Sequence, residues 1–216
     1  MTQKAPERLK QYLSSFPCVA ILRGITPEEV LSIGEILLKE GIQIIEVPLN
    51  SPRPFESIER LQKHFGEDAL IGAGTVLRLE ELLRVHEIGG QLIVSPHCDT
   101  ALIQQTLNLH MVSIPGVFTP TEAFEAIHKG AHALKWFPAQ GVSPSYFRAM
   151  NAVLPPDIPA LAVGGVGPET MQMYWDAGLR GFGVGGALYK PGDTTEDVQK
   201  KASSLRQAWE QMDKES

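Results

Sequence analysis

The sequence predicts an α/β fold, and three observations favour a closed (β/α)8 barrel, the TIM-barrel architecture. Short apolar runs alternate with longer amphipathic segments along all 216 residues. Eight runs can be counted, and their ends advance by about 20 to 30 residues, close to the length of a βαβ step. Gly or Pro bounds each run, as is typical of buried parallel strands. Known barrels begin at roughly 200 residues, so the chain has room for one.

The predicted strands are rich in branched side chains. They cover residues 18–23, 42–47, 69–73, 91–95, 110–114, 132–137, 159–163 and 180–184. An open, doubly wound sheet is the alternative, but neither GAGTVL (72–77) nor GFGVGG (181–186) has the glycine spacing of a dinucleotide-binding fingerprint. No segment has the composition of a linker. We therefore expect a single domain over residues 1–216.

Helix signals fall between the strands. Thr26 is followed by Pro27 and Glu29, which predicts a helix with an N-cap, a proline in its first turn and a capping-box carboxylate. Gly41 predicts its end. The same pattern returns over residues 119–130 and, more loosely, over 167–178. A further helix at about residues 5–15 is predicted ahead of the first strand.

The composition excludes several classes of function. With 19 basic and 25 acidic residues, the net charge is −6, which is not the basic footprint of a protein that binds nucleic acid or an anionic membrane. No stretch of roughly 18 apolar residues could span a bilayer, and residues 1–17 lack the apolar region of a signal peptide. Two cysteines are too few for a disulfide framework, so we expect a cytoplasmic protein.

Polar side chains at the ends of the predicted strands are the candidates for chemistry, because barrel active sites lie at the C-terminal ends of the strands. Arg23, Glu46, Thr75 and Lys135 occupy these positions in strands 1, 2, 3 and 6. Ser95 and His97 follow strand 4, and for His97 a plain hydrogen-bonding role is the simpler interpretation. The six histidines form no i, i+4 pair within a predicted helix, because His132, four residues after His128, begins a predicted strand, so no metal site is expected.

Lys135 is the most informative residue, because apolar residues flank it in Ala133–Pro138. Burial would lower the pKa of its amine and so produce a nucleophile that can form a Schiff base with a carbonyl. The alternative is a lysine whose ammonium reaches past the strand end into water.

Glu46 interrupts a run of branched apolar residues, and strand alternation places it on the face opposite Ile45 and Val47. A carboxylate there is either a general acid/base for an iminium intermediate or one half of a structural ion pair, which Lys135 itself could complete. Burial and a nearby ammonium would shift its pKa in opposite directions, so the sequence alone predicts no net direction.

Two glycine pairs, Gly164–Gly165 and Gly185–Gly186, end strands 7 and 8. Barrels commonly bind phosphate in these loops, where backbone N–H groups can approach an anion. The pairs therefore indicate a phosphorylated ligand. The alternative is that the glycines relieve crowding at tight turns.

Six motifs, in order, resemble a known family. They are ILRGIT (21–26), IEVPLNSP (45–52), IGAGTV (71–76), LKWFPA (134–139), AVGGV (162–166) and GVGGALY (183–189). Together the chain resembles the 2-keto-3-deoxy-6-phosphosugar acid aldolases of the class I, Schiff-base type. The resemblance implies cleavage of a keto sugar acid to pyruvate and D-glyceraldehyde 3-phosphate, no metal or organic cofactor, and a homotrimer.

The resemblance also implies roles for individual residues. Lys135 would be the Schiff-base lysine and Glu46 the acid/base. Arg23 and Thr75 would hold the pyruvyl end of the substrate. Phe137 and Pro138 would form the pocket wall. The phosphate would be bound by the glycine pairs, Gly164, Gly165, Gly185 and Gly186.

Two features favour the galactonate branch of this family over the gluconate branch. Asn50 replaces the arginine of the gluconate branch's EVTLRT motif and so removes that cation, and Val163 replaces a threonine and cannot hydrogen-bond a substrate hydroxyl. Gly186 stands where many relatives have a serine, so the phosphate would be held more weakly or another group would compensate.

Three alternatives remain open from the sequence. The first is the gluconate epimer as substrate. The second is a metal-dependent aldolase that polarises the ketone with a divalent ion. The third is a noncatalytic barrel that binds a phosphosugar, although that function has no use for a lysine buried beside a carboxylate.

Overall fold

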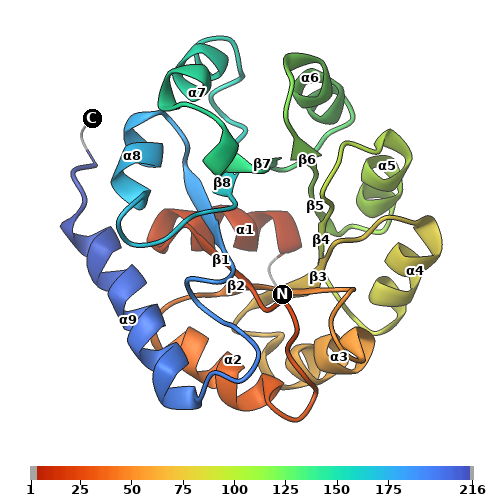
Figure 1. Ribbon diagram of the computed structural model, residues 1–216. Coiled ribbons are helices and arrows are strands. Elements are labelled where there is room, and N and C mark those ends of the chain that lie inside the picture. The colour runs from red at the N-terminus through yellow and green to blue at the C-terminus, as the bar shows by residue number, and fades with distance from the viewer. Residues whose placement is uncertain (1–3, 215–216) are drawn as a thin grey trace.

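A computed structural model describes residues 4–214, so the first three and last two residues of the predicted domain lie outside it. A ring of helices surrounds a central parallel sheet (Figure 1). The strands are β1 (Cys18–Ile21), β2 (Ile44–Pro48), β3 (Leu70–Gly74), β4 (Leu92–Val94), β5 (Val112–Ile114), β6 (Gly116–Val117), β7 (Leu134–Trp136), β8 (Ala160–Val163) and β9 (Gly181–Val184). The helices are α1 (Ala5–Ser15), α2 (Val30–Lys39), α3 (Pro54–Phe65), α4 (Leu79–Glu87), α5 (Thr100–Asn108), α6 (Pro120–His128), α7 (Pro144–Asn151), α8 (Met171–Asp176) and α9 (Thr195–Gln211), with a 3-10 turn at Ala139–Gly141.

The sheet closes on itself through a broken strand. Its order is β5-β4-β3-β2-β1-β9-β8-β7-β6, and each hydrogen-bonded pair is parallel. Pro115 alone separates β5 from β6, because proline has no N–H to donate to a ladder. At Gly116 the backbone passes so close to the β4 loop that a Cβ would lie 2.4 Å from the carbonyl carbon of Pro96. The predicted (β/α)8 barrel is therefore confirmed, and β6 is the piece of its fifth strand that the predicted range 110–114 omits.

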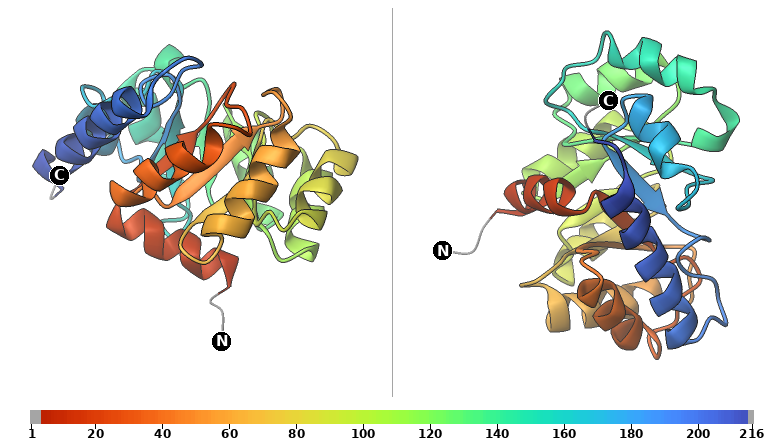
Figure 2. Two further views of the ribbon diagram at one scale, coloured as in Figure 1. Left: turned by 90° about the horizontal axis from the view of Figure 1, so that it is seen from below. Right: turned by 90° about the vertical axis from the view of Figure 1, so that its left-hand side faces the viewer.

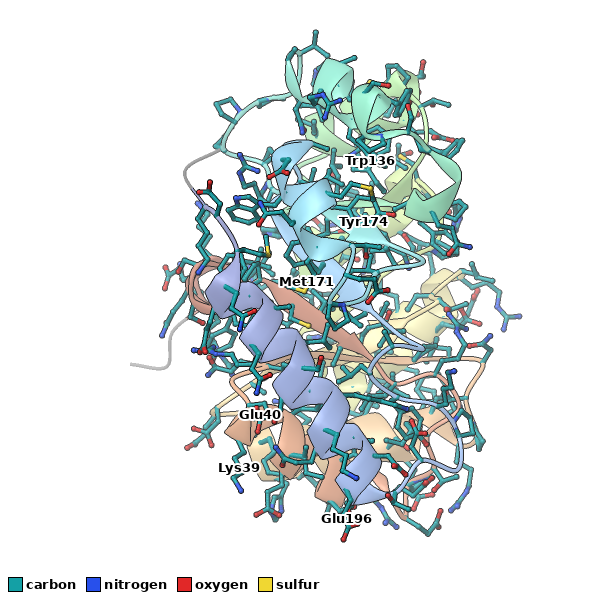
Figure 3. All side chains as sticks on the ribbon, turned by 60° about the vertical axis from the view of Figure 1, so that its left-hand side comes forward. Lys39, Glu40, Trp136, Met171, Tyr174 and Glu196 are labelled. Atoms are coloured by element: carbon teal, nitrogen blue, oxygen red, sulfur yellow. The ribbon has the colours of Figure 1, made fainter. Side chains whose placement is uncertain are left out.

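Strand alternation sorts the core into two layers. One set of buried side chains faces the barrel axis, and it includes Val19, Ile44 and Leu161. The other set packs between the strands and the surrounding helices. Trp136 and Tyr174, labelled in Figure 3, belong to this outer layer, where the ring of Phe147 stands edge-on to both at centroid distances of 5.9 and 6.0 Å. Polar residues on the inner face of a strand are thus enclosed by the barrel.

Helix α1 closes the N-terminal end of the barrel, beneath the ring (Figure 2). Its Leu9 and Tyr12 pack with the side chains on the barrel axis. Its Arg8 is buried and donates hydrogen bonds to the carbonyl oxygen of Ala69 at 2.6 Å, to Oε1 of Gln91 at 2.9 Å and to the hydroxyl of Tyr12 at 3.2 Å. The predicted extra helix at residues 5–15 is confirmed. Access to the interior is left at the C-terminal ends of the strands.

The predicted helix ends are confirmed, but two predicted helix starts are not. The start predicted more loosely at residues 167–169 is wrong, since α8 begins at Met171 after a turn. Thr119 caps α6 with the expected capping box, and a glycine with positive φ follows α2, α6 and α8 at residues 41, 130 and 178. The predicted start of the second helix at Pro27 is wrong, since α2 begins at Val30 after a turn. The hydroxyl of Thr26 donates to the Glu29 carboxylate at 2.5 Å, so it does not cap the backbone as a helix N-cap would. Within residues 4–214, no helix combines the length and apolarity that crossing a membrane requires.

Candidate active site

A cavity of about 370 Å³ opens at the C-terminal ends of the strands. Its volume is suited to a small organic ligand. Eight residues singled out from the sequence line it: Arg23, Lys135, Phe137, Val163, Gly164, Gly165, Gly185 and Gly186. The other lining residues are Ile21, Val166, Glu169, Gly183 and Ala187. Of the remaining predicted site residues, Pro138 lies beside Gly164, Thr75 contacts Arg23, and Glu46 lies deeper in the barrel.

Lys135 points into the barrel and is 5% exposed. Its neighbours in β7, Leu134 and Trp136, face the outer layer, so alternation directs the lysine inward. The Nζ atom lies 4.9 Å from the centroid of the Phe137 ring. Burial lowers the pKa of the Lys135 amine, the charge of Arg23 lowers it further, and the Glu46 carboxylate opposes both effects. The structure therefore does not support the alternative of an ammonium that reaches bulk water.

Glu46 is 1% exposed in β2, and its Oε2 atom has no hydrogen-bond partner. Burial raises the pKa of this carboxyl to about 7, although the charges of Lys135 and Arg23 pull it downward. Desolvation thus decides the net direction that the sequence left undetermined. A carboxyl with a pKa near 7 can both accept and release a proton at neutral pH.

Glu46 and Lys135 line the same small void inside the barrel. Ile21, Val163 and Gly183 line both this void and the larger cavity, and Lys135 also borders both. Among the described residues, none forms an ion pair with either Glu46 or Lys135, so the alternative of a structural ion pair between them is not what the structure shows. Each group keeps its hydrogen-bonding capacity for a ligand.

Gly74 makes room for the carboxylate. It lies in β3, which pairs directly with β2. A Cβ at position 74 would stand 1.7 Å from Oε2 and 2.5 Å from Oε1 of Glu46, closer than any side chain could tolerate. In the sequence, this glycine stands out only as part of the IGAGTV motif. Its spatial role depends on strand pairing and has no local signal.

Arg23 is held in place by two side chains. One guanidinium nitrogen donates to Oδ1 of Asn50 at 2.5 Å, and another lies 3.4 Å from the hydroxyl of Thr75. Thr75 has a φ of 56°, in the left-handed region that non-glycine residues seldom adopt. Asn50 therefore does more than remove a second arginine: it fixes the arginine that remains, whose charge acts on Glu46 and Lys135.

The two glycine pairs differ in what requires them. Gly164 and Gly165 have φ values of 100° and 70°, and a Cβ at Gly165 would lie 2.5 Å from Oε1 of Gln140. Backbone geometry alone explains this pair. Gly185 and Gly186 have ordinary φ values, and a Cβ on either would find its nearest neighbour at 3.8 and 3.7 Å. The second pair is thus not required by crowding.

Several other candidates lie outside the cavity. Ser95 donates a hydrogen bond to the carbonyl oxygen of His97 at 2.8 Å, and neither residue lines the cavity. Cys18 is buried, and burial raises the pKa of its thiol to about 12. The described part of the chain contains no group of three His, Cys, Asp or Glu residues that could hold a metal ion.

The chain is similar over most of its length to proteins of known sequence. A probable 2-dehydro-3-deoxy-6-phosphogalactonate aldolase from Rhizobium meliloti (strain 1021) is 45% identical over 194 residues, which are 90% of this chain and 92% of the relative. A 2-dehydro-3-deoxy-6-phosphogalactonate aldolase from Escherichia coli (strain K12) is 42% identical over 199 residues, 92% of this chain and 97% of the relative.

Solved structures share the fold. One, described as a native KDPGal structure, superposes with a TM-score of 0.89 at 42% identity and covers 90% of this chain and 95% of that chain. A porous protein cage designed by fusing symmetric oligomeric domains has a TM-score of 0.88 at 42% identity, over 90% of this chain and 72% of that chain. A KDPG aldolase from Legionella pneumophila, with pyruvate captured as a covalent carbinolamine intermediate, has a TM-score of 0.77 at 25% identity, over 91% and 94%.

The same relationship appears at the level of the whole family. A model of the KDPG and KHG aldolases matches residues 9–202, a range that contains every strand of the barrel and each residue of the cavity. With the identity of the two relatives above, this range shows that the chain belongs to the KDPG and KHG aldolase family.

Proposed function

We propose that the protein is a class I aldolase that cleaves 2-dehydro-3-deoxy-6-phosphogalactonate to pyruvate and D-glyceraldehyde 3-phosphate. The observation that carries this function is that Lys135 and Glu46 are both buried without an ion-pair partner among the described residues, in the small void beneath the cavity at the C-terminal ends of the strands. A buried amine with a lowered pKa is the nucleophile that Schiff-base chemistry needs. The substrate named for the two relatives and the covalent pyruvate adduct of the Legionella enzyme support the same chemistry.

The mechanism begins with the neutral amine of Lys135. Its lone pair attacks C2 of the keto acid, and loss of water from the carbinolamine gives an iminium. Glu46, as the carboxylate, takes the proton of the C4 hydroxyl. The C3–C4 bond then breaks, its electrons flow into the iminium to form an enamine, and the aldehyde leaves. Protonation of the enamine at C3 and hydrolysis of the resulting iminium release pyruvate and restore the amine of Lys135.

The lining residues give the substrate one orientation. Arg23, positioned by Asn50 and Thr75, is the cation for the C1 carboxylate. Phe137 and Pro138 would wall the pyruvyl end. The glycine pairs also line the cavity, where their amides can receive the 6-phosphate. No metal or organic cofactor takes part in this scheme.

Val163 bears on the choice of C4 epimer, because it lines both the inner void and the cavity. Its apolar side chain offers no hydrogen bond to a C4 hydroxyl. A site that lacks a hydroxyl contact loses the discrimination of one to a few kcal/mol that such a contact supplies. Without that contact, the preference for the galactonate epimer rests on the substrate named for the two relatives, and the gluconate epimer is the alternative substrate.

Trapping of the covalent intermediate tests the reaction class. Sodium borohydride added to the enzyme with pyruvate is expected to reduce the Schiff base and leave a stable adduct on the peptide that contains Lys135. Peptide mass spectrometry locates it. An adduct on another lysine, or none at all, contradicts the mechanism, and so does turnover that survives in Lys135→Met. A wild type that binds the phosphosugar acid without turnover favours the noncatalytic barrel.

Pyruvate release from the two C4 epimers, assayed side by side, tests the substrate. We expect a higher kcat/KM for the galactonate epimer. Preference for the gluconate epimer would contradict the inference from Asn50 and Val163 while leaving the aldolase chemistry intact, because the trapping experiment does not depend on C4.

We further propose a homotrimer in the cytoplasm. Leu77, Leu79 and Leu83 are exposed large apolar side chains around the start of α4, and residues 79 and 83 lie one helical turn apart. An exposed apolar patch of this kind suits contact with another copy of the chain. The designed cage similar to this chain is built from symmetric oligomeric domains. Sedimentation of the wild type and of a Leu79→Glu, Leu83→Glu variant tests this, with dissociation to monomers expected for the variant.

A further inference from the structure

We call the part of the cavity lined by Gly164, Gly165, Gly185 and Gly186 its glycine end. Among the described residues, no free cation lines this end. The two cations that line the cavity are Arg23 and Lys135. The first is engaged by Asn50 and Thr75, and the second is the proposed Schiff-base amine. In the described part of the chain, the one carboxylate in the lining is that of Glu169, on the loop that follows Gly164–Gly165. A phosphate dianion at this end would meet a like charge and a chain of net charge −6.

Lys190 stands next to this end. After β9 the chain makes one helical turn, in which the N–H groups of Leu188 and Tyr189 both donate to the carbonyl oxygen of Gly185. Residues 186 and 190 therefore lie one turn apart. The Cε atom of Lys190 is 3.7 Å from the point where a Cβ of Gly186 would stand. The absent side chain at 186 thus leaves open the space into which the lysine extends.

The backbone of Lys190 is fixed while its ammonium is free. Its N–H donates to Oδ2 of Asp193 at 2.7 Å, and the next residue, Pro191, packs against Gly24 so closely that a Cβ there would lie 2.6 Å from Cγ of the proline. The Asp193 carboxylate is itself paired with Lys201. Among residues 4–214, none forms an ion pair or hydrogen bond with Nζ of Lys190.

From this arrangement, and resting on the proposed function, we propose that Lys190 is a substrate-binding residue that supplies the positive charge for the 6-phosphate. Its ammonium reaches over Gly186 and pairs with the phosphate that the backbone N–H groups of Gly185 and Gly186 hold. The site thus selects phosphorylated substrates through a charge at its rim.

Condensation of pyruvate with two aldehydes tests the proposal. D-Glyceraldehyde 3-phosphate and D-glyceraldehyde differ only in the phosphate, so the ratio of their kcat/KM values isolates its contribution. In Lys190→Met, which keeps the apolar stem, we expect this ratio to fall about tenfold, as for loss of one charged hydrogen bond. Lys190→Arg is expected to retain most of the ratio. Lys129→Met, an exposed lysine at the C-terminal end of α6, is the matched control and should keep the wild-type ratio.

Two further measurements make the outcome specific. Added salt should raise the KM for D-glyceraldehyde 3-phosphate in the wild type, and this dependence should flatten in Lys190→Met because a screened charge pair is gone. Introducing Gly186→Ser into Lys190→Met should restore part of the ratio.

An unchanged ratio in Lys190→Met, or an equal fall for both aldehydes, overturns the proposal. In that case the wild type still forms the borohydride-trapped adduct and still uses the phosphorylated aldehyde, so the proposed function stands. If the wild type itself uses neither aldehyde, both the proposed function and the role of Lys190 fall together.

Discussion

Each end of the barrel buries one basic side chain, and the two differ in whether that side chain has hydrogen-bond acceptors. At the N-terminal end, Arg8 is 4% exposed and donates to three oxygen acceptors, from Ala69, Gln91 and Tyr12. At the C-terminal end, Lys135 is 5% exposed, and none of the described residues accepts a hydrogen bond from its Nζ atom. Arg8 and Lys135 are therefore buried to nearly the same extent, but only Arg8 donates hydrogen bonds within the described part of the protein.

This difference indicates a structural role for Arg8 and a reactive role for Lys135. A buried charge is costly unless partners compensate it, and Arg8 has those partners. Lys135 and Glu46 have no such hydrogen-bond partners among residues 4–214, and the cost of burial appears as a lowered pKa for the amine and a raised pKa for the carboxyl. In the proposed mechanism, the substrate supplies the missing hydrogen-bond partners. The comparison predicts that mutations at the two ends will have opposite effects on stability and activity.

The largest effect is expected for Lys135→Met. Loss of the nucleophile should lower kcat by a factor on the order of 10⁴ or more. The free energy of unfolding should not fall, because no hydrogen bond is lost and a buried ammonium is replaced by an apolar group. Steady-state kinetics and urea unfolding check the two statements. A large loss of stability would show that Lys135 is structural, as Arg8 is.

Glu46→Gln should come next, with a loss of kcat on the order of 10² to 10⁴. In the wild type, kcat/KM is expected to rise with pH through about 7, as the Glu46 carboxyl loses its proton. This limb should vanish in the variant, which has no proton to lose. A pH profile with the same acid limb in both proteins would assign that limb to another group.

The same carboxyl has a thermodynamic signature. Its pKa in the folded protein lies above the ordinary value of 4.5, so the folded state favours the protonated form. The wild type should therefore lose stability as the pH rises from about 5 to 8, by an amount on the order of 3 kcal/mol. Glu46→Gln should lose less over this interval. Urea unfolding at both pH values measures the difference.

Arg8→Met should have the opposite profile to Lys135→Met. We expect the free energy of unfolding to fall by about 2 to 4 kcal/mol, because the oxygens of Ala69 and Gln91 lose their charged donor in a buried site. The kcat of the folded protein should change little. Lys10→Met, at an exposed position on the same helix, is the control. A loss of kcat without a loss of stability would contradict the assignment of the N-terminal end to structure.

The smallest effect is expected for Asn50→Ala. Without the Asn50 side chain, Arg23 is no longer held, and the KM for pyruvate in the condensation reaction should rise by about threefold to tenfold. Because Arg23 lowers the pKa of Glu46, the acid limb of the pH profile should also shift to higher pH. Asn108→Ala, on the exposed surface of α5, should change neither value.

The barrel could be predicted from the sequence because its signals are local. Each strand is a short apolar run, each run is bounded by Gly or Pro, and the pattern of Thr, Pro and Glu marks a helix start within four residues. The exceptions arise where a single residue changes the local hydrogen bonding. The Thr26 hydroxyl donates to a carboxylate and does not cap the backbone, so α2 begins later than predicted. Pro115 divides the fifth strand in two, and the apolar run that predicts this strand ends at residue 114, one residue before the proline.

The site could be predicted less completely, because its geometry depends on residues far apart in the chain. Lys135 and Glu46 were visible as charged residues in apolar strands. Gly74, which leaves space for Glu46, was not, because the clash it avoids exists only after β2 and β3 pair. Arg8 gave no signal either, since its acceptors at Gln91 and Ala69 lie 83 and 61 residues away. Spacing along the sequence carries no information about such contacts.

Gly74 has a consequence for how the reactivity of this protein could be altered. The carboxylate of Glu46 occupies the space that a side chain at position 74 of the adjacent strand would fill. Adding a single methyl group at position 74 would displace the acid without altering any charge or any residue of the cavity wall. The position of the Glu46 carboxylate thus depends on the absence of a side chain in β3, and under the proposed mechanism Gly74→Ala should lower activity as a substitution of Glu46 would.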